Sequence, residues 1–347
     1  MDTKGLTSVF ETLLSRNQAF VFFRLPHSKT VHCFFQEDQN LTQTADLKVS
    51  GFIMSRFEDP LPAAYISNAN HLQWKYTPPV VESPQKAKTL PQEDPSIYIN
   101  IVNKIKKAID NGALKKLVVA RQLFLQEEVE PLPMFSQLLS LYPDAMVYFW
   151  HHPKAETWIG ATPEQLFSLH SGTLTTMALA GTLPYHSQGT YNWGKKEKKE
   201  QQWVKDTLVS ELQALFSAEQ VSCSDTFTRR AGNLVHLCNE LSVNVQEVNL
   251  KELVKKLHPT PAVGGIPLDS GLQFLSENEN LDRAYYAGFL GPVFSAAQID
   301  LYVNLRCAQM TKKGLQLYVG AGITADSDPE KEWEETQNKA KTLLAAL

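Results

Sequence analysis

The chain has 347 residues, of which 43% are hydrophobic and 20% charged, as is usual for a water-soluble globular protein. Its formal net charge of −4 at pH 7 gives no support to nucleic-acid binding or to attraction by acidic membranes. The four cysteines lack C-x-x-C spacing, which argues against a zinc site or a disulfide framework. Since no apolar run approaches the ~20 residues that span a bilayer and no signal pattern opens the chain, we expect a cytoplasmic protein.

The first part of the chain carries no recognisable motif. Residues 1 to 76 are expected to form mixed short strands and helices, and the apolar run from Ala19 to Phe23 is one candidate strand. Residues 77–95 contain five prolines among polar residues, which indicates a linker or a surface crossing.

A helix is predicted directly after the prolines. Asp94 can cap it, Pro95 suits its first turn, and Gly112 is expected to end it. Apolar residues recur there at helical spacing, so one face of the helix should be buried. The predicted apolar stripe is Ile97, Ile101, Ile105, Ala108 and Ile109.

The rest of the chain alternates apolar, β-branched runs with amphipathic segments. Ser171-Gly172 and Lys312-Lys313-Gly314 are good turns, so two pairs of strands are predicted as hairpins. The predicted strands are residues 117–120, 146–150, 166–170, 173–179, 301–310 and 315–319. The predicted helices are residues 133–142, residues 195–216, and a terminal helix that starts near Ser327, where Ser327 and Glu330 have capping-box spacing.

Strands grouped with long helices, without regular βαβ alternation, are typical of antiparallel sheets covered by helices, an α+β fold. The proline-rich segment does not clearly separate two independent cores. We therefore predict a single large domain, in which an N-terminal part, residues 1–93, packs on a catalytic region, residues 94–347.

The most informative segment lies near the end of the chain, where Gly320-Ala321-Gly322 precedes the terminal helix. Spacings of three and seven residues put Glu332, Glu335 and Lys339 on one face of that helix. Such a face can hold a hard divalent cation and, one turn on, a carboxylate of a ligand. The glycine-rich strand end can offer amide N–H groups to an anion.

Glu200 is a second candidate metal ligand, because it lies one turn before the apolar stripe of its predicted helix. Two carboxylates from separate helices, completed by water and substrate oxygens, are the usual way proteins hold Mg²⁺. Ordinary surface carboxylates explain Glu200 and Glu335 at least as well when each is taken alone.

Lys116 and Glu164 are candidates for a general base and a general acid. If both faces of its strand are covered, Lys116 loses solvation, which favours the neutral amine; the alternative is a strand-end lysine that reaches water. A proline turn can aim Glu164 into a cleft, where burial keeps its proton available; the alternative is a solvated turn residue. For each residue alone, the alternative is favoured.

Two further features suit a small anionic ligand. Arg306 is expected in a strand next to the glycine-rich segment, and a guanidinium group binds carboxylates bidentately. The proline- and glycine-rich loop of residues 258–267 could close over such a ligand. Neither the P-loop pattern nor G-x-G-x-x-G is present, so nucleotide binding ranks low.

Together these residues resemble the chorismate-utilising enzymes and, within them, the isochorismate synthases, from about residue 94 to the end. Any one matching segment is weak evidence, but their order and combination are highly specific. The segments are Lys116 to Arg121, Gly160 to Glu164, Leu179 to Thr182, His258 to Pro267, Arg283 to Gly288, Asn304 to Ala308, and Gly320 to Lys339.

The resemblance implies one α+β domain with two antiparallel β-sheets sandwiched between helices. It implies chorismate, a cyclohexadiene with two carboxylates, as the substrate, and Mg²⁺ held by Glu200 and Glu335, with Glu332 acting through water. The positions that match substrate-binding residues are Gly181, His236, Arg306, Gly320, Gly322 and Lys339.

By the same resemblance, Lys116 is the base that activates water for attack at ring carbon 2, and Glu164 is the acid that protonates the hydroxyl leaving carbon 4. Relatives that use ammonia carry glutamine where Lys116 stands, so lysine indicates water as the nucleophile. Aminodeoxychorismate synthases commonly have a lysine where Ala180 stands, and alanine argues against that route.

Two positions depart from the family pattern. Gln201 replaces a common histidine, which could alter metal affinity, and Thr162 replaces a common serine. The expected activity is that of an isochorismate synthase; the alternatives are a salicylate synthase, which also eliminates pyruvate, and a non-catalytic relative that binds chorismate or another dicarboxylate. A monomer that supplies menaquinone synthesis, with no nucleic-acid or membrane partner, is the default expectation.

Overall fold

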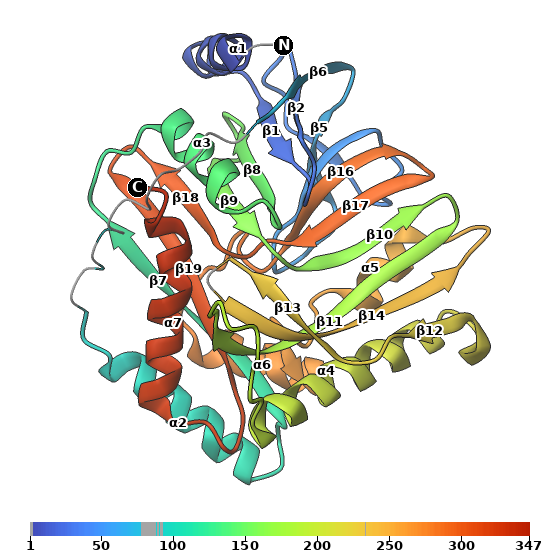
Figure 1. Cartoon of the computed structure of the whole chain (residues 1–347), viewed down its shortest axis with the longest axis vertical. Coiled ribbons are helices and arrows are strands. Elements are labelled where there is room, and N and C mark those ends of the chain that lie inside the picture. Colours follow the sequence, from blue (N-terminus) through green and yellow to red (C-terminus); the bar gives the residue numbers. More distant parts are fainter. Residues whose placement is uncertain (1–2, 78–87, 89, 91–92, 233) are drawn as a thin grey trace.

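Two large β-sheets form the centre of the computed structural model, which describes residues 3–77, 88, 90, 93–232 and 234–347 (Figure 1). One sheet has nine strands: β1 (Phe20–Arg24), β2 (Thr30–Phe35), β6 (Asn70–Lys75), β7 (Lys116–Leu125), β8 (Met146–His151), β9 (Thr157–Thr162), β15 (Gly265–Ile266), β18 (Cys307–Thr311) and β19 (Gly314–Ile323). The other has ten: β3 (Thr42–Thr44), β4 (Gly51–Met54), β5 (Ala63–Ser67), β10 (Gln165–His170), β11 (Thr173–Pro184), β12 (Val221–Cys223), β13 (Phe227–Ala231), β14 (Leu234–Asn244), β16 (Phe289–Ser295) and β17 (Gln298–Val303).

All neighbouring strands in both sheets run antiparallel. The strand order is β15-β7-β19-β18-β9-β8-β1-β2-β6 in the nine-stranded sheet. It is β12-β14-β11-β10-β17-β16-β4-β5-β3 in the ten-stranded sheet, where β13 also pairs with β14. Together with the helices, this arrangement confirms the predicted α+β fold with two antiparallel sheets.

Helices cover both sheets. They are α1 (Thr3–Ser15), α2 (Ser96–Asp110), α3 (Pro131–Leu141), α4 (Lys195–Gln213), α5 (Leu250–Leu257), α6 (Leu268–Asn278) and α7 (Pro329–Leu344), with a short 3-10 helix at Ala218–Gln220. Helices α2, α3 and α7 contact the nine-stranded sheet, α4 contacts β11 and β14 of the other, and α6 contacts β15 (Figure 1). Among the described residues, no helix combines the length and apolar character needed to cross a membrane.

Strand β1 shows how the sheets share their cores. Side chains alternate between the faces of a strand. Val21 and Phe23 join the core between the two sheets, whereas Phe20 and Phe22 join the core under α1 and α3. A continuous apolar run is therefore buried on both faces, which confirms the strand expected near Ala19 to Phe23.

The N-terminal strands extend both sheets. Strands β1, β2 and β6 lie at one end of the nine-stranded sheet, and β3, β4 and β5 lie at one end of the other. The division between residues 93 and 94 stays a prediction. Residues 78–87, 89 and 91–92 of the expected linker lie outside the described residues.

The strand predicted over residues 301–310 is wrong as a single element. Strand β17 ends at Val303 in one sheet and β18 starts at Cys307 in the other, so residues 304–306 carry the chain between the sheets. Asn304 holds this crossing: its side chain donates to the Tyr285 carbonyl at 2.9 Å and accepts from the Tyr148 hydroxyl at 2.7 Å. The second predicted hairpin is therefore β18–β19, while the first, β10–β11, is confirmed.

Two details of the predicted helices are also wrong. In the predicted apolar stripe of α2, Ile97 is 74% exposed and Tyr98 is buried instead, whereas Ile105 is buried and Ile101, Ala108 and Ile109 pack partly buried against the core, as predicted. Helix α4 ends at Gln213 rather than at residue 216.

The start of α7 also differs from the expected capping box. Asp328 caps the helix by accepting from the N–H groups of Glu330 and Lys331, both at 3.1 Å. Ser327 accepts instead from the Thr324 N–H at 3.0 Å, so its hydroxyl is already used by the preceding turn.

Candidate active site

One cavity, of about 880 Å³ with its mouth included, gathers the candidate residues from both sheets. This size suits a small-molecule ligand. Of the residues singled out in the sequence, those that line it are Lys116, Glu164, Gly181, Glu200, His236, Arg306, Gly320, Gly322, Glu335 and Lys339. Only Glu332 among the proposed site residues is not part of the lining.

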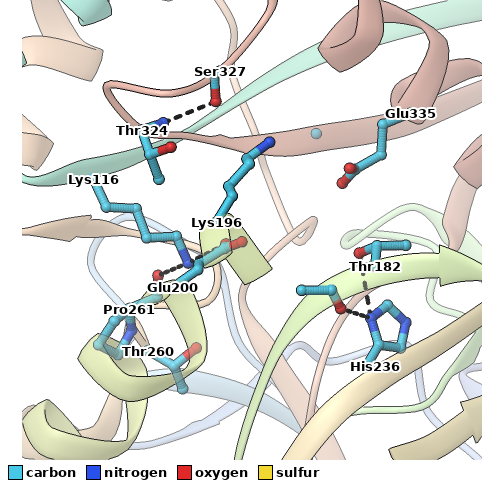
Figure 2. Close-up of polar contacts among 12 residues, drawn as sticks. Lys116, Thr182, Lys196, Glu200, His236, Thr260, Pro261, Thr324, Ser327 and Glu335 are labelled. Carbon is cyan, nitrogen blue, oxygen red and sulfur yellow. Dashed lines mark hydrogen bonds and ion pairs between the residues drawn. The ribbon is translucent and has the colours of Figure 1, made fainter. Parts of the chain in front are cut away.

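Lys116 lies at the start of β7 and enters the cavity on the same face as Val118, as the alternation of the strand predicts. Its side chain is 1% exposed, so it does not reach bulk water. The ammonium nitrogen lies 2.9 Å from Glu200 Oε1 and donates to the Pro261 carbonyl at 2.9 Å (Figure 2). Both faces of the strand are covered, so the alternative of a strand-end lysine that reaches water is excluded.

Glu164 occupies the turn between β9 and β10 and is 4% exposed. Burial raises its pKa from the ordinary 4.5 to about 7, although the Thr260 hydroxyl and the charge of Lys116 lower it. The hydroxyl of Thr260 donates to Glu164 Oε1 at 3.2 Å. A carboxyl with this pKa can both hold and release a proton near neutral pH, and a solvated turn glutamate is excluded.

The loop of residues 258–267 touches both candidates. Thr260 contacts Glu164, and the carbonyl of the next residue, Pro261, contacts Lys116. Its last part, β15, pairs with Lys116 and Leu117 at the start of β7. The loop therefore acts as a common support for the two groups, and Ala262 and Val263 line the cavity beside them.

Carboxylates of α7 pair with lysines of α7 and α4. Glu335 Oε1 lies 2.8 Å from Lys339 Nζ one turn along α7. Glu332, 2% exposed, pairs instead with Lys196 of α4 and lies behind the cavity wall. Burial alone would lower the pKa of Lys196, but the carboxylates Glu332, Glu335 and Glu200 together raise it. Figure 2 shows Lys196 beside Glu200, with Glu335 across the cavity.

The donor set suits a hard divalent cation. Within the described part of the chain, no three His, Cys, Asp or Glu side chains already stand in metal-binding geometry. The carboxylates Glu332, Glu335 and Glu200 all raise the pKa of Lys196, and Glu332 pairs with it directly. Gly322 leaves the room that Glu200 needs, because a Cβ there would lie 2.6 Å from Glu200 Oε1. Oxygen donors of this kind are those that Mg²⁺ prefers.

Other residues of the lining are suited to binding carboxylates. Arg306 lines the cavity from the crossing between β17 and β18, with φ +49, rather than from within a strand as predicted. Lys339 donates to the Gly320 carbonyl at 2.8 Å. Gly320 and Gly322 lie in the last four residues of β19, as the predicted glycine-rich strand end requires, and a Cβ on Gly320 would lie 3.0 Å from the Tyr286 hydroxyl. The glycines thus keep the cavity floor free of side chains.

His236 presents a neutral imidazole. Burial and the nearby charge of Arg306 lower its pKa to about 3. Its Nδ1 pairs with the Gly181 carbonyl at 2.8 Å and must carry the proton, since a carbonyl only accepts. Its buried Nε2 has no partner among the described residues, which leaves a hydrogen-bond acceptor for a ligand hydroxyl at the cavity.

Several lining residues escaped the sequence analysis. Lys196 and Glu197 lie on α4, and Tyr286 lies on the segment before β16. A signal for Glu197 existed: Glu197 and Glu200 repeat the three-residue spacing of Glu332 and Glu335. Nothing local marks Lys196, because its partner is 136 residues away.

Gln201, which departs from the family pattern, is buried beneath the site rather than in its lining. Its amide donates to the Ala178 carbonyl at 2.9 Å and to Asn239 Oδ1 at 3.0 Å. The side chain therefore ties α4 to strands β11 and β14 and does not point at the cavity.

Comparison with known proteins places these residues in a family. Residues 50–347 match the family model described as chorismate binding enzyme. The chain belongs to the chorismate-binding enzyme family. It is 30% identical to the chloroplastic isochorismate synthase of Catharanthus roseus over 71% of this chain and 44% of that protein. It is 29% identical to the isochorismate synthase MenF of Haemophilus influenzae over 70% of this chain and 59% of that protein.

The chain thus spans about half the length of these two relatives. A solved structure of the menaquinone-specific isochorismate synthase MenF from Escherichia coli has the same fold, with a TM-score of 0.79 over 95% of this chain and 88% of that one, at 22% identity. This agreement over nearly the whole chain confirms the fold that the resemblance implied.

Because the pKa of Glu164 is raised, the free energy of unfolding of this chorismate-binding protein should depend on pH. Because the folded state holds this proton up to about pH 7 and the unfolded state loses it near 4.5, stability should fall as pH rises through that window. Glu164→Gln removes the effect, so the variant should gain up to about 3 kcal/mol over the natural protein at pH 8 and little at pH 4. Urea unfolding at several pH values measures this.

Glu128→Gln is the matched control, since Glu128 is exposed. This substitution should change the free energy of unfolding only slightly, and by the same amount at pH 4 and at pH 8. If Glu164→Gln behaved like the control, Glu164 would be solvated in solution.

Proposed function

We propose that this protein is an isomerase, a Mg²⁺-dependent isochorismate synthase that converts chorismate to isochorismate. One observation carries the proposal: a buried lysine and a buried glutamic acid with a pKa of about 7 line the same cavity. A protein that only bound a dicarboxylate would have no need for a positioned base and acid. Family membership and the names of the relatives point to the same substrate class.

In the proposed reaction, Lys116 acts in its neutral amine form, whose Nζ takes a proton from a water molecule as the oxygen of that water adds to ring carbon 2. The ring double bonds shift, and Glu164 gives its proton to the hydroxyl that leaves carbon 4 as water. One water is consumed and one is released, so the net change is an isomerisation. Ala180 lines the cavity where a lysine would be needed for a covalent route, which supports water as the nucleophile.

The remaining lining residues would bind and orient the substrate. The guanidinium of Arg306 and the ammonium of Lys339 suit its two carboxylates, with Gly181, Gly320 and Gly322 leaving room for the ring. The unpaired Nε2 of His236 suits a ring hydroxyl. Removal of water from the cavity would strengthen each of these contacts.

Glu200 and Glu335 would hold Mg²⁺, and Glu332 would act through water. The bound ion would neutralise the ring carboxylate of the substrate as charge moves during the reaction. The monomeric state, the cytoplasmic location and a role in menaquinone synthesis stay predictions.

The deciding experiment incubates the purified protein with chorismate and Mg²⁺ and identifies the product by chromatography and fluorescence. Isochorismate as the sole product supports the proposal. Salicylate formed without an added lyase would instead assign a salicylate synthase, and chorismate bound but unchanged would assign a non-catalytic binder.

Lys116→Gln should reduce kcat by roughly 10²- to 10⁴-fold, because the amide cannot accept the proton of the attacking water. Binding of chorismate should weaken far less, which calorimetry on the inactive variant measures. Lys115→Gln, an exposed neighbour, serves as the control. Turnover at the natural rate in Lys116→Gln would remove this lysine from the mechanism.

Glu335→Gln should raise the Mg²⁺ concentration needed for half-maximal activity by at least about tenfold, since it removes one charged oxygen donor. Direct binding of Mn²⁺, followed by electron paramagnetic resonance, should weaken in parallel. Glu334→Gln changes an exposed carboxylate next to it and should leave both titrations unaltered. Identical titrations for the two variants would refute the assignment of Glu335.

A further inference from the structure

Strand β7, which carries Lys116, has an incomplete neighbour on one side. Strand β19 pairs with it from Leu117 to Leu125, but β15 reaches only Lys116 and Leu117. One further bond, from the Val118 N–H to the Gly264 carbonyl at 2.9 Å, continues the pairing. Beyond that point, the described residues offer no strand to the outward backbone groups of Val118 and Ala120.

A buried ion pair fills this gap. Glu279 Oε1 accepts from the Ala120 N–H at 2.6 Å, and Arg283 donates to the Val118 carbonyl at 2.8 Å. The two side chains also bind each other twice, both bonds at 2.7 Å. They thus supply one acceptor and one donor to the strand edge, as the backbone of a neighbouring strand would.

The same guanidinium also fixes the loop that touches the candidate base and acid. Its third nitrogen donates to the Val263 carbonyl at 3.0 Å. Two and three residues earlier, Pro261 and Thr260 contact Lys116 and Glu164. One arginine therefore connects the strand of the base to the loop that supports both catalytic groups.

Burial of both charged side chains costs free energy, so the ion pair is not an efficient way to stabilise the fold alone. The side chains of Arg283 and Glu279 are 1% and 4% exposed, and Arg283 also lies over the ring of Phe57, 4.4 Å from its centre. Packed hydrophobic residues of similar volume are often as stabilising as a buried ion pair. What such residues cannot do is hold the polar edge of β7 at a fixed position.

We propose that Glu279 and Arg283 are positioning residues for the reaction: by completing the edge of β7 and tying it to the loop of residues 258–267, they set the relative positions of Lys116 and Glu164. This inference rests on the proposed isochorismate synthase activity. The pair touches neither substrate nor reacting atoms.

The test compares three variants of the full chain with chorismate as substrate. Arg283→Lys keeps the charge but cannot reach both carbonyls, so kcat should fall by about 10²-fold, as for a small misplacement of reacting groups. Glu279→Leu should lower kcat similarly. Glu279→Gln keeps an oxygen for the Ala120 N–H and should retain more of the rate. KM should stay within about twofold, because the carboxylate-binding residues are unchanged.

Arg24→Lys provides the matched control. Arg24 is equally buried and donates to three carbonyls, those of Leu139, Tyr142 and Ala145, but it lies far from β7 in the strand order. Its substitution should lower the melting temperature while kcat per folded molecule stays unchanged. Hydrogen exchange over residues 116–125 should rise in the Glu279 variants and not in the control.

Three outcomes would overturn the inference: natural kcat in folded Arg283→Lys, equal rates for Glu279→Gln and Glu279→Leu, or unaltered exchange in β7. Should Arg283→Lys not fold, the two Glu279 variants carry the test alone. If the natural protein fails to convert chorismate, the proposed function fails first and the inference with it. If it is active and the variants match it, only the inference fails.

Discussion

The pairing of buried charges between the two sheets is the constraint on which the rest of the site depends. A lysine or glutamate enclosed here loses its hydration, and an isolated charge would cost several kcal/mol. The structure meets this cost with three lysine–carboxylate pairs: Lys116–Glu200, Lys196–Glu332 and Lys339–Glu335. Each pair joins a group with a proposed chemical role to a counter-charge, so the side chains are fixed and their charges balanced by the same contacts.

This balance requires elements that are far apart in the sequence. Strand β7 delivers Lys116, α4 delivers Glu200 and Lys196, and α7 delivers Glu332 and Glu335, which become neighbours because β7 pairs with β19 and α7 packs on it. The crossing at residues 304–306 then brings Arg306 to the same cavity from between the sheets. The two-sheet arrangement is thus what allows acid, base and cations to share one small volume (Figure 1).

Local signals explain what could be predicted from the sequence. The Ser171-Gly172 turn and the continuous apolar run of β1 need only neighbouring residues to specify them, and both were correct. The break at Asn304 was missed because its bonds go to Tyr148 and Tyr285, which no local pattern reveals. The sequence predicts one continuous strand over residues 301–310, whereas the chain forms β17 and β18 there, in different sheets.

The candidate site likewise contains residues that the sequence could identify and residues that it could not. Lys116 and Glu164 could be identified by resemblance, but their burial, which decides between chemistry and a solvated side chain, depends on contacts with the distant loop at Thr260 and Pro261. Lys196 lies in a run of lysines that the sequence assigns to a solvated face, and only its distant partner Glu332 distinguishes it from a surface residue.

The charges that line the cavity bear on how substrate and metal would bind. Among the described residues, four basic and four carboxyl side chains line it, and one carboxyl, Glu164, has a pKa of about 7. The cavity is therefore close to neutral without any ligand. A dianionic substrate alone would leave it strongly negative, and a divalent cation alone would leave it strongly positive, whereas the two together restore the balance. Under the proposed function, each should therefore raise the affinity for the other, and linkage requires the two effects to be equal.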